Sequence, residues 1–252
     1  MIINILDQRF VFVFGSNLAG RHGSGAALDA NRFYGAQPGV AEGLVNNSYA
    51  LPTKDRNLET LPLSVIERSV DRLFKTAAKS NKFFLVSSIG CGLAGYTDKE
   101  IAPLFLPYIS KYKNVKLPGR WLYDNHLLEQ PRYIIAGSRY DDDSKIKTIE
   151  AVYRELSLLN DVTLVSGACP NSPDSLAVEY YREYKVKQQL ELKTFPAPWD
   201  RDRRYAGILR NKFMSWYSTH LIAFWDNRSR GTRAMIDIAT SDGLYNKTVF
   251  LL

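Results

Sequence analysis

The chain repeatedly passes from a short apolar run, through a turn rich in glycine or serine, into a segment with helical spacing. The first case is residues 10–36, where "FVFVFG" leads through "SNLAGRHGSG" into the alanine-rich "AALDANRFYGA". Alternating strand and helix signals favour parallel sheets covered by helices. Such sheets bind ligands beyond the carboxyl ends of their strands. The sequence therefore predicts an α/β fold and directs the search for a site to the turns.

Two such series follow one another. The first has a strand at 48–54 and ends with a helix at 97–112, where Thr97 and Glu100 form a capping box. The second starts with "RYIIAGSR" and ends with "KTVFLL". Further helices are expected at 24–34, 63–80 and 144–160. Pro118, Gly119 and Pro131 interrupt the pattern between the series. We predict two domains, 1–118 and 132–252, joined by a linker at 119–131.

Composition narrows the classes of partner. No apolar run approaches the length of a membrane span, and the first residues lack a signal-peptide pattern, so we expect no membrane partner and a cytoplasmic location. The net charge is +7, and residues 1–118 carry 14 Lys and Arg against 9 Asp and Glu. This charge suits an anionic ligand, although no dense Lys/Arg run indicates nucleic acid. Cys91 and Cys169 lie far apart, and we expect neither a disulfide nor a metal site.

Three turns of the first series follow predicted strands: "GSNLAGRHGSGAA", "LPTKD" and "SIGCGLAGY". Glycine lets backbone N–H groups approach phosphate oxygens, and a helix N-terminus favours the anion. The alternative is that these glycines only form turns. Asn17 is placed to bond a ribose or to position the loop. His22 is expected to be a solvent-exposed loop histidine, with ligand contact as the alternative.

Residues 1–115 resemble the macrodomain, a three-layer α/β/α fold that binds ADP-ribose, and the pattern is closest to macrodomain-like proteins of phage and prophage genomes. In that resemblance "GSNLAGRHGSGAALDA" matches the loop that holds the distal ribose, and "GCGLAGY" matches the loop around the diphosphate. The ligand-binding residues it implies here are Gly15, Asn17, Gly23, Gly25, Ala26, Thr53, Gly90, Cys91, Gly92, Leu93, Gly95 and Tyr96.

The segment "LPTKD" resembles that of macrodomains which remove ADP-ribose from carboxylates or DNA bases, and this makes Lys54 the candidate catalytic residue. One such subgroup has an acidic residue directly after "GCGL", where this chain has Ala94. The next acidic residue, Asp98, is expected to be a first-turn charge of the following helix. A solvated loop lysine is the alternative reading of Lys54.

Residues 132–240 resemble the SLOG superfamily of Rossmann-like nucleotide-binding proteins, which includes phosphoribohydrolases. The matching segments are "GSR", "SGACPNSPDSLA", "FPAPWD", "GILRN" and "AFWDNRSRGT". Ser229, Gly231 and Thr232 are expected to hold a phosphate at a helix start, with Arg139, Arg210 and Arg230 as cations. The implied ligand-binding residues are Gly137, Ser138, Arg139, Gly167, Asp174, Arg210, Asn211, Asp226, Ser229, Gly231 and Thr232.

This half also departs from the superfamily that it resembles. "SGACPNSPD" lacks two glycines of the usual motif, and no glutamate follows Gly231 and Thr232 where the phosphoribohydrolases have theirs, which favours binding over hydrolysis. Trp199 and Trp225 are expected to be core residues rather than base-stacking ones. Three further arginines are expected in a solvated loop: Arg201, Arg203 and Arg204. Residues 141–143 read as an acidic helix start rather than a metal site.

Three functions follow as expectations. The first is binding of ADP-ribose or a related NAD-derived nucleotide, with hydrolysis of an ADP-ribosyl linkage through Lys54. The second is a non-catalytic sensor or sponge for NAD-derived signal nucleotides in phage–host conflict, and the third is a SLOG-type nucleotide N-glycosidase. The expected partners are a nucleotide and an ADP-ribosylated macromolecule, with no separate cofactor. The SLOG resemblance implies a dimer, and a phage-encoded chain would act in the host cytoplasm.

Overall fold

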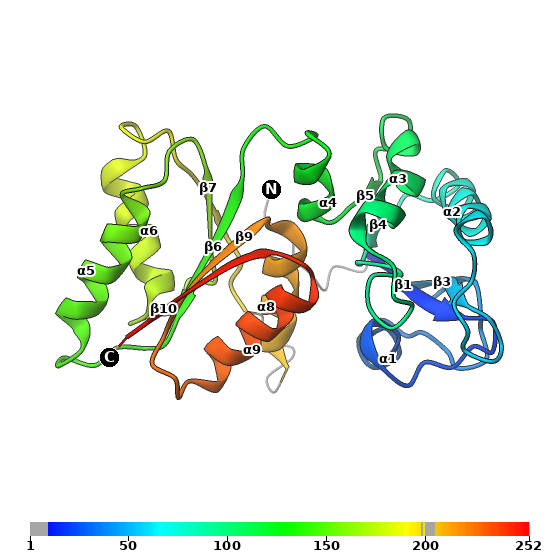
Figure 1. The fold of residues 1–252 in the computed structure, drawn as a ribbon, viewed down its shortest axis with the longest axis horizontal. Helices are drawn as coiled ribbons and strands as arrows, with labels where there is room; N and C mark the ends of the chain where they lie inside the picture. Colours follow the sequence, from blue (N-terminus) through cyan, green and yellow to red (C-terminus); the bar gives the residue numbers. More distant parts are fainter. Residues whose placement is uncertain (1–9, 198, 200–204, 252) are drawn as a thin grey trace. The chain divides into compact units, whose positions relative to one another are not determined.

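The computed structural model describes residues 10–197, 199 and 205–251. The chain is α/β, as predicted, with two five-stranded sheets. It divides into two compact units, Leu6–Trp121 and Leu122–Leu252, called here the first and second units, and each holds one sheet (Figure 1). No helix in the described ranges is both long enough and apolar enough to cross a bilayer.

The sheet of the first unit has the strand order β2-β3-β1-β4-β5. The central strand β1 (Phe10–Asn17) runs parallel to β3 (Ser48–Lys54) and β4 (Phe83–Val86), and β4 runs parallel to the short β5 (Val115–Lys116). The three-residue strand β2 (Gly43–Val45) adds an antiparallel edge to β3. The parallel order predicted from the alternating pattern is therefore confirmed for all strands of this sheet except β2.

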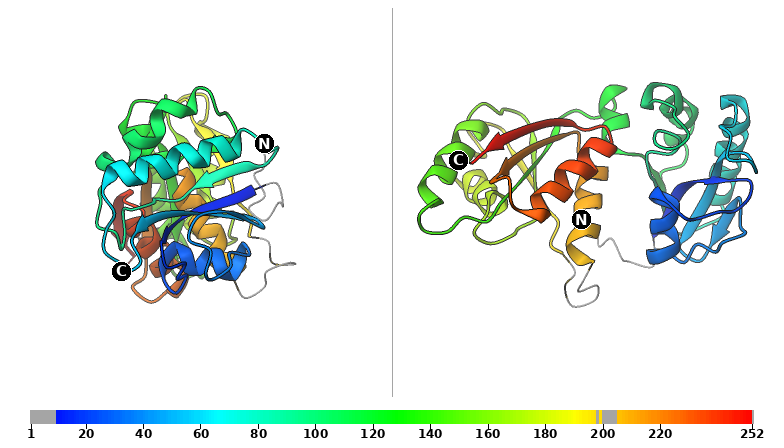
Figure 2. Two further views of the ribbon diagram at one scale, coloured as in Figure 1. Left: turned by 90° about the vertical axis from the view of Figure 1, so that its right-hand side faces the viewer. Right: turned by 60° about the horizontal axis from the view of Figure 1, so that its bottom comes forward.

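Helices cover both faces of this sheet. The helix α1 (Gly25–Phe33) lies on one face, where its alanines pack against Phe14 of β1, while α2 (Leu63–Ala77) and α3 (Asp98–Ile109) lie on the other (Figure 2). The predicted capping box of α3 is confirmed, because the Glu100 carboxylate accepts hydrogen bonds from Thr97 N at 2.8 Å and Thr97 Oγ1 at 2.7 Å.

The segment expected to be a linker begins with a helix, α4 (Gly119–Asp124). Trp121 of this helix is 1% exposed, stacks at a tilt on Phe105 and donates from Nε1 to Asp98 at 2.7 Å. The division between the units falls directly after Trp121. The segment departs from an irregular linker because burial of this indole anchors its first half to the first unit.

The second unit has a fully parallel sheet in the order β10-β9-β6-β7-β8. Its strands are β6 (Arg132–Gly137), β7 (Thr163–Ser166), β8 (Glu191–Thr194), β9 (His220–Trp225) and β10 (Tyr245–Phe250). The connecting helices are α5 (Lys145–Leu156), α6 (Pro173–Tyr184), α8 (Ala206–Tyr217) and α9 (Arg230–Ser241). The helices α5 and α6 pack together, as do α8 and α9. The chain runs from the central strand β6 to β7 and β8 on one side of the sheet, and then crosses to β9 and β10 on the other side.

Candidate functional site

The two glycine-rich turns of the first unit meet at the reversal point of its sheet. From β1 the chain continues to β3 on one side, and from β4 it continues to β5 on the other. Loops that leave neighbouring parallel strands in opposite directions mark the usual ligand position of such sheets. Residues 18–24 follow β1 and residues 87–97 follow β4, so both turns singled out in the sequence lie at this point.

Gly15, near the end of β1, lies close to both β3 and the loop after β4. An ideal Cβ placed on Gly15 would be 3.5 Å from Thr53 Oγ1 and 3.7 Å from Gly90 N. Thr53 is buried near the end of β3, and its hydroxyl donates to the Ser16 carbonyl at 3.4 Å. The structure therefore brings together Gly15, Thr53 and Gly90, which the sequence analysis had assigned to one site.

Asn17 holds the first loop in place. Its side chain donates to Arg21 O at 2.8 Å and accepts from Arg21 N at 3.0 Å, and the residue is 9% exposed. Both polar ends of the amide are thus used within the loop, which favours the bracing role over ribose binding. Gly20 has φ +66°, and its ideal Cβ would lie 2.5 Å from Gly39 C. The sequence analysis did not predict the close approach of Gly39 to Gly20. The Pro38-Gly39 dipeptide, which is typical of a turn, was the available signal.

His22 is not the exposed loop histidine that we expected. It is 6% exposed, and its ring meets the ring of Phe14 edge-on at 5.0 Å. Neither ring nitrogen reaches hydrogen-bond geometry with a partner in the described part of the chain. Burial lowers the pKa of His22, and the nearby Val40 carbonyl opposes this shift only in part. The expectation failed because the imidazole packs against the buried ring of Phe14 instead of facing solvent.

Gly25 and Ala26 are the first residues of α1, and Gly23 precedes its N-cap residue. Gly23 and Gly25 are exposed, and an ideal Cβ on either would meet no atom within 4 Å. Ser24 is the N-cap residue, but its side chain makes no capping hydrogen bond. The start of α1 therefore has no side-chain cap and is not covered by neighbouring atoms at Gly23 and Gly25, which suits anion binding at a helix N-terminus.

The loop after β4 is tied to the segment that precedes α2. Tyr96 Oη donates to Leu61 O at 2.7 Å, and Thr60 Oγ1 donates to Ala94 O at 2.8 Å. Burial, together with Asp98, raises the pKa of the Cys91 thiol, so this cysteine stays protonated at neutral pH and is a poor nucleophile. Gly92, Leu93 and Gly95 are exposed, and Leu93 is 72% exposed. These three residues are the accessible part of the loop.

Lys54 ends β3 at the same edge of the sheet. Its carbonyl accepts from Leu18 N at 2.9 Å, which joins β3 to the first glycine-rich loop. Its ammonium group makes no ion pair with a described residue. Asp98, the first acidic residue after "GCGL", accepts instead from Trp121 Nε1. The Asp98 carboxylate thus stabilises the packing of α4, beyond the first-turn charge that the sequence predicted.

The reversal point of the second unit lies between β6 and β9, and Ser138 and Asp226 join the two loops there through two hydrogen bonds. Ser138 Oγ donates to Asp226 Oδ1 at 2.7 Å and accepts from Asp226 N at 3.1 Å. The same carboxylate oxygen accepts from Ser229 N at 2.8 Å and Arg228 N at 2.9 Å. Burial alone would raise the pKa of Asp226, but the hydrogen bonds from Ser229, Ser138 and Arg228 lower it overall.

Ser229 is the N-cap of α9, so Gly231 and Thr232 lie in the first turn of this helix. Ser229 Oγ accepts from Thr232 N at 3.3 Å and from Thr232 Oγ1 at 3.1 Å. Gly231 is exposed with no atom within 4 Å of an ideal Cβ, and Arg139 and Arg230 are exposed as well. This helix start therefore presents backbone N–H groups and two cations toward solvent.

Arg210, Asn211, Asp174 and Gly167 form a buried network instead of an open surface. Arg210 donates from Nη1 to Gly167 O at 2.8 Å and from Nε to Asn211 Oδ1 at 2.9 Å. Asp174, which is 4% exposed, lies 3.9 Å from Arg210 Nη1 and accepts from Gly167 N at 3.0 Å. Burial raises the pKa of the Asp174 carboxyl, and Arg210 opposes this shift. These side chains are already satisfied by one another.

Gly137 is required by packing of the unit on itself. An ideal Cβ there would lie 2.4 Å from Pro173 Cγ and 2.5 Å from Phe224 O. Trp199 is 57% exposed, so the expectation of a core residue is wrong for it, while Trp225 is half-buried and donates to Ser229 O at 3.1 Å. The arginines 201, 203 and 204 lie outside the described residues.

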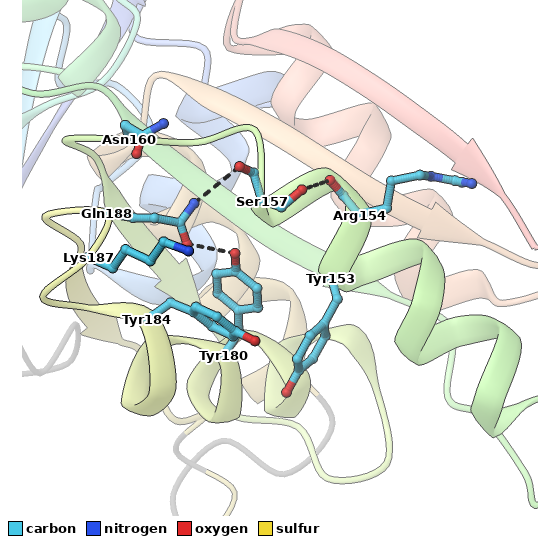
Figure 3. A pocket seen from close by; sticks show the side chains of 8 residues that line it. All are labelled: Tyr153, Arg154, Ser157, Asn160, Tyr180, Tyr184, Lys187 and Gln188. Atoms are coloured by element: carbon cyan, nitrogen blue, oxygen red, sulfur yellow. Dashed lines mark hydrogen bonds between the residues drawn. The ribbon is translucent and has the colours of Figure 1, made fainter.

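Two surface hollows lie away from both reversal points. One, of about 460 Å³, lies at the ends of α5 and α6, where Tyr180 donates to Gln188 (Figure 3). It is lined by Tyr153, Arg154, Ser157, Asn160, Tyr180, Tyr184, Lys187 and Gln188. The other, of about 660 Å³, lies between α2 and the β2–β3 hairpin of the first unit. Neither is lined by a residue of the predicted nucleotide sites, which rest on converging loops and helix starts instead.

No known protein-family model matches this chain, and no curated protein matches its sequence. Within the described ranges, no group of three or more His, Cys, Asp or Glu side chains is arranged to hold a metal ion. Cys91 and Cys169 are free thiols. Residues 141–143 precede α5, where Asp141 Oδ1 accepts from Ser144 N at 2.9 Å, as an acidic helix start does.

Proposed function

We propose that the chain binds ADP-ribose, or a related NAD-derived nucleotide, between the two glycine-rich loops of the first unit. The observation that supports this proposal most is the convergence of Gly15, Thr53 and Gly90 at the reversal point of the sheet. A diphosphate at this point meets backbone N–H groups with little steric hindrance, and the open start of α1 favours its charge. The resemblance to macrodomains supplies the ligand class.

Hydrolysis of an ADP-ribosyl linkage is the catalytic form of this proposal. Lys54 ends β3 beside the first loop, and a lysine amine is suited to attack or polarise the anomeric carbon of a ribose. An ADP-ribosylated macromolecule is then the substrate. This form requires that Lys54→Ala abolish turnover while the affinity for ADP-ribose is kept.

A non-catalytic sensor or sponge is the second candidate, and a specific observation favours it. Ala94 stands where one hydrolase subgroup has an acid, and the Asp98 carboxylate is bound by Trp121. No acidic group of the described residues therefore pairs with Lys54. Binding without turnover needs only the loops and the helix start, all of which are present.

The second unit would bind a phosphate or nucleotide at the start of α9. The exposed backbone at Gly231 is the anion site of this proposal, with Arg139 as a nearby cation. The buried Thr232 supports it through its hydrogen bonds to the N-cap Ser229. N-glycosidase activity is less well supported here, because Asp174 and Arg210 are engaged with each other.

The test is calorimetric titration of the whole chain with ADP-ribose, NAD and AMP, followed by chromatography of each mixture. Gly23→Val adds a side chain in open space at the first loop, and Gly231→Val does the same at the start of α9. We expect Gly23→Val to abolish ADP-ribose binding and Gly231→Val to leave it intact, so each variant is the control for the other. Retained affinity in Gly23→Val would refute the site. A second incubation, with an ADP-ribosylated protein, separates the two candidates: release of free ADP-ribose favours the hydrolase, and its absence in a chain that binds ADP-ribose favours the sensor.

A further inference from the structure

The first unit contains two long stretches with cations and no acidic residue. Neither Asp nor Glu occurs in residues 72–97 or in residues 101–123. The cations of these stretches are Arg72, Lys75, Lys79, Lys82, Lys111, Lys113, Lys116 and Arg120. In the sequence they are spread too thinly to indicate a basic surface.

The fold gathers six of these cations. We call the set the lysine surface, and its members are Lys75, Lys79, Lys82, Lys111, Lys113 and Lys116. Asn114 holds the contributing segments together, because its Nδ2 donates to Ala77 O at 2.9 Å, Ser80 O at 3.2 Å and Lys82 O at 3.1 Å. The end of α2 and the segment after α3 are thereby fixed to the start of β4.

Aromatic rings lie among these lysines. Phe74 of α2 stacks on Tyr108 at 4.5 Å and tilts against Tyr112 at 5.3 Å, which packs the ends of α2 and α3 together. Lys111 Nζ lies 5.3 Å from the Tyr112 ring centre, and Lys116 Nζ lies 5.9 Å from that of Phe83. Phe74 is fully buried, so the rings that lie among the lysines at the surface are the half-buried Tyr108, Tyr112 and Phe83. Cations interleaved with aromatic rings are the combination found where proteins bind nucleic-acid strands.

Helix capping explains only part of this charge. One or two cations near a helix C-terminus stabilise its dipole, and α2 and α3 both end here. Six lysines exceed that need, and they repel one another. Within the described residues only Lys75 of the six has a carboxylate partner, Asp71 at 2.6 Å, and five of the six are exposed, Lys82 being half-buried. The uncompensated charge therefore calls for an anion from outside the chain.

The hollow of about 660 Å³ adjoins this surface. Lys75, Lys79 and Ser80 line it together with Tyr49, whose hydroxyl has its pKa raised to about 12 by burial and stays a neutral hydrogen-bonding group. Glu42 also lines the hollow, and its carboxylate is neutralised by an ion pair with Arg72 at 2.8 Å. A nucleotide base or sugar fits a hollow of this size, with its phosphates on the neighbouring lysines.

We propose that the lysine surface binds the phosphate backbone of a nucleic acid. It lies at the amino ends of β3 and β4, whereas the nucleotide site proposed above lies at their carboxyl ends. The inference therefore does not depend on ADP-ribose binding. An acidic protein is the competing class, but the rings between the lysines and the adjoining hollow favour a polymer of bases and phosphates.

The experiment measures fluorescence anisotropy of a labelled oligonucleotide of about 20 nucleotides, single-stranded or as a duplex, from about 50 to 200 mM salt. The variant is Lys79→Gln/Lys113→Gln, and the matched control is Lys145→Gln/Lys147→Gln, which removes two exposed lysines from the second unit. The variant and the control each lose two positive charges, so their net charges are equal. We expect tight, salt-sensitive binding by the native chain and by the control.

In Lys79→Gln/Lys113→Gln the slope of log affinity against log salt should become shallower by about 0.7 for each lost phosphate contact on a single strand. The preference between single strand and duplex then identifies the form of the ligand. Equal affinity in the variant and the native chain would overturn the proposal, and so would an absence of binding by the native chain. A poly-glutamate peptide that binds as tightly as the oligonucleotide would overturn the choice of nucleic acid. Unchanged ADP-ribose titration in the variant separates this result from the proposed function.

Discussion

The guanidinium group of Arg210 occupies the space where a side chain of Gly167 would lie. An ideal Cβ on Gly167 would be 1.6 Å from Arg210 Nη1 and 2.7 Å from Asp174 Oδ1. The two residues are 43 positions apart and are joined by the hydrogen bond from Arg210 Nη1 to the Gly167 carbonyl at 2.8 Å. The glycine is therefore a packing requirement of the second unit, whatever ligand that unit binds.

Gly167→Ala should destabilise the second unit by about 1 to 3 kcal/mol, because the guanidinium must leave its partners to make room for the methyl group. Gly231→Ala is the control, since an ideal Cβ there meets nothing within 4 Å. Urea unfolding followed by tryptophan fluorescence measures both variants. Equal midpoints for the two would show that Arg210 is held less firmly than its contacts indicate.

Arg210→Met should cost about 3 to 5 kcal/mol at neutral pH, because it leaves the Asp174 carboxylate buried without its cation. Burial already raises the pKa of Asp174. A folded-state pKa above the unfolded value gives a contribution that is complete below pH of about 4 and is lost as pH rises through the folded value. Loss of Arg210 raises this pKa further, so the variant should be less impaired at pH 5 than at pH 8. Asp174→Asn/Arg210→Met should flatten that difference, and a pH-independent loss would contradict it.

Local patterns were sufficient for the parts of the fold that depend on local physics. The apolar spacing from Ile66 to Ala77 predicted α2, and Thr97 with Glu100 predicted the start of α3. The placement of Gly15 beside Gly90 followed from the rule that turns after parallel strands share an edge. Each of these features depends either on residues close in sequence or on the order of the strands in the sheet.

Features that depend on tertiary contacts could not be predicted in this way. The contact of Arg210 with Gly167 joins distant turns, and the lysine surface exists only because Asn114 bonds to segments more than 30 residues away. The strand β2 has three residues, too few for the alternating apolar pattern of a strand to show in the sequence. His22 was misassigned because its burial depends on packing against Phe14 of β1, which the local sequence of the loop does not reveal.

His22 should make the stability of the first unit depend on pH. Its pKa is lowered by burial, so the unfolded chain binds the proton more readily than the folded one. The contribution is present above pH of about 6.5, the usual value for histidine, and is lost as pH falls through the folded value. His22→Leu removes the titration and two buried nitrogens without hydrogen bonds, so it should flatten the pH profile without loss of stability at pH 7.

Hydrogen exchange of the peptides covering residues 10–34, followed from pH 5 to pH 8 and corrected for intrinsic rates, measures this effect within the first unit. His126→Leu is the control, since that histidine belongs to the second unit. Protection that falls equally at low pH in His22→Leu and in the native chain would assign the dependence to other groups.

The hydrogen bond between Ser138 and Asp226 should be the main link between the two loops at the reversal point of the second unit. Ser138→Ala removes a donor that is 2% exposed and an acceptor for Asp226 N, so we expect a loss of about 1 to 2 kcal/mol in the free energy of unfolding. Ser157→Ala also removes a serine hydroxyl, but one that bonds within its own exposed helix end, and should cost less than about 0.5 kcal/mol.

Because Asp226 also positions Ser229 N, Ser138→Ala should weaken AMP binding at the start of α9, if AMP binds there, without affecting ADP-ribose binding in the first unit. Urea unfolding and calorimetry with both nucleotides measure the two effects. A loss of ADP-ribose affinity in Ser138→Ala would show that the nucleotide sites are not separate.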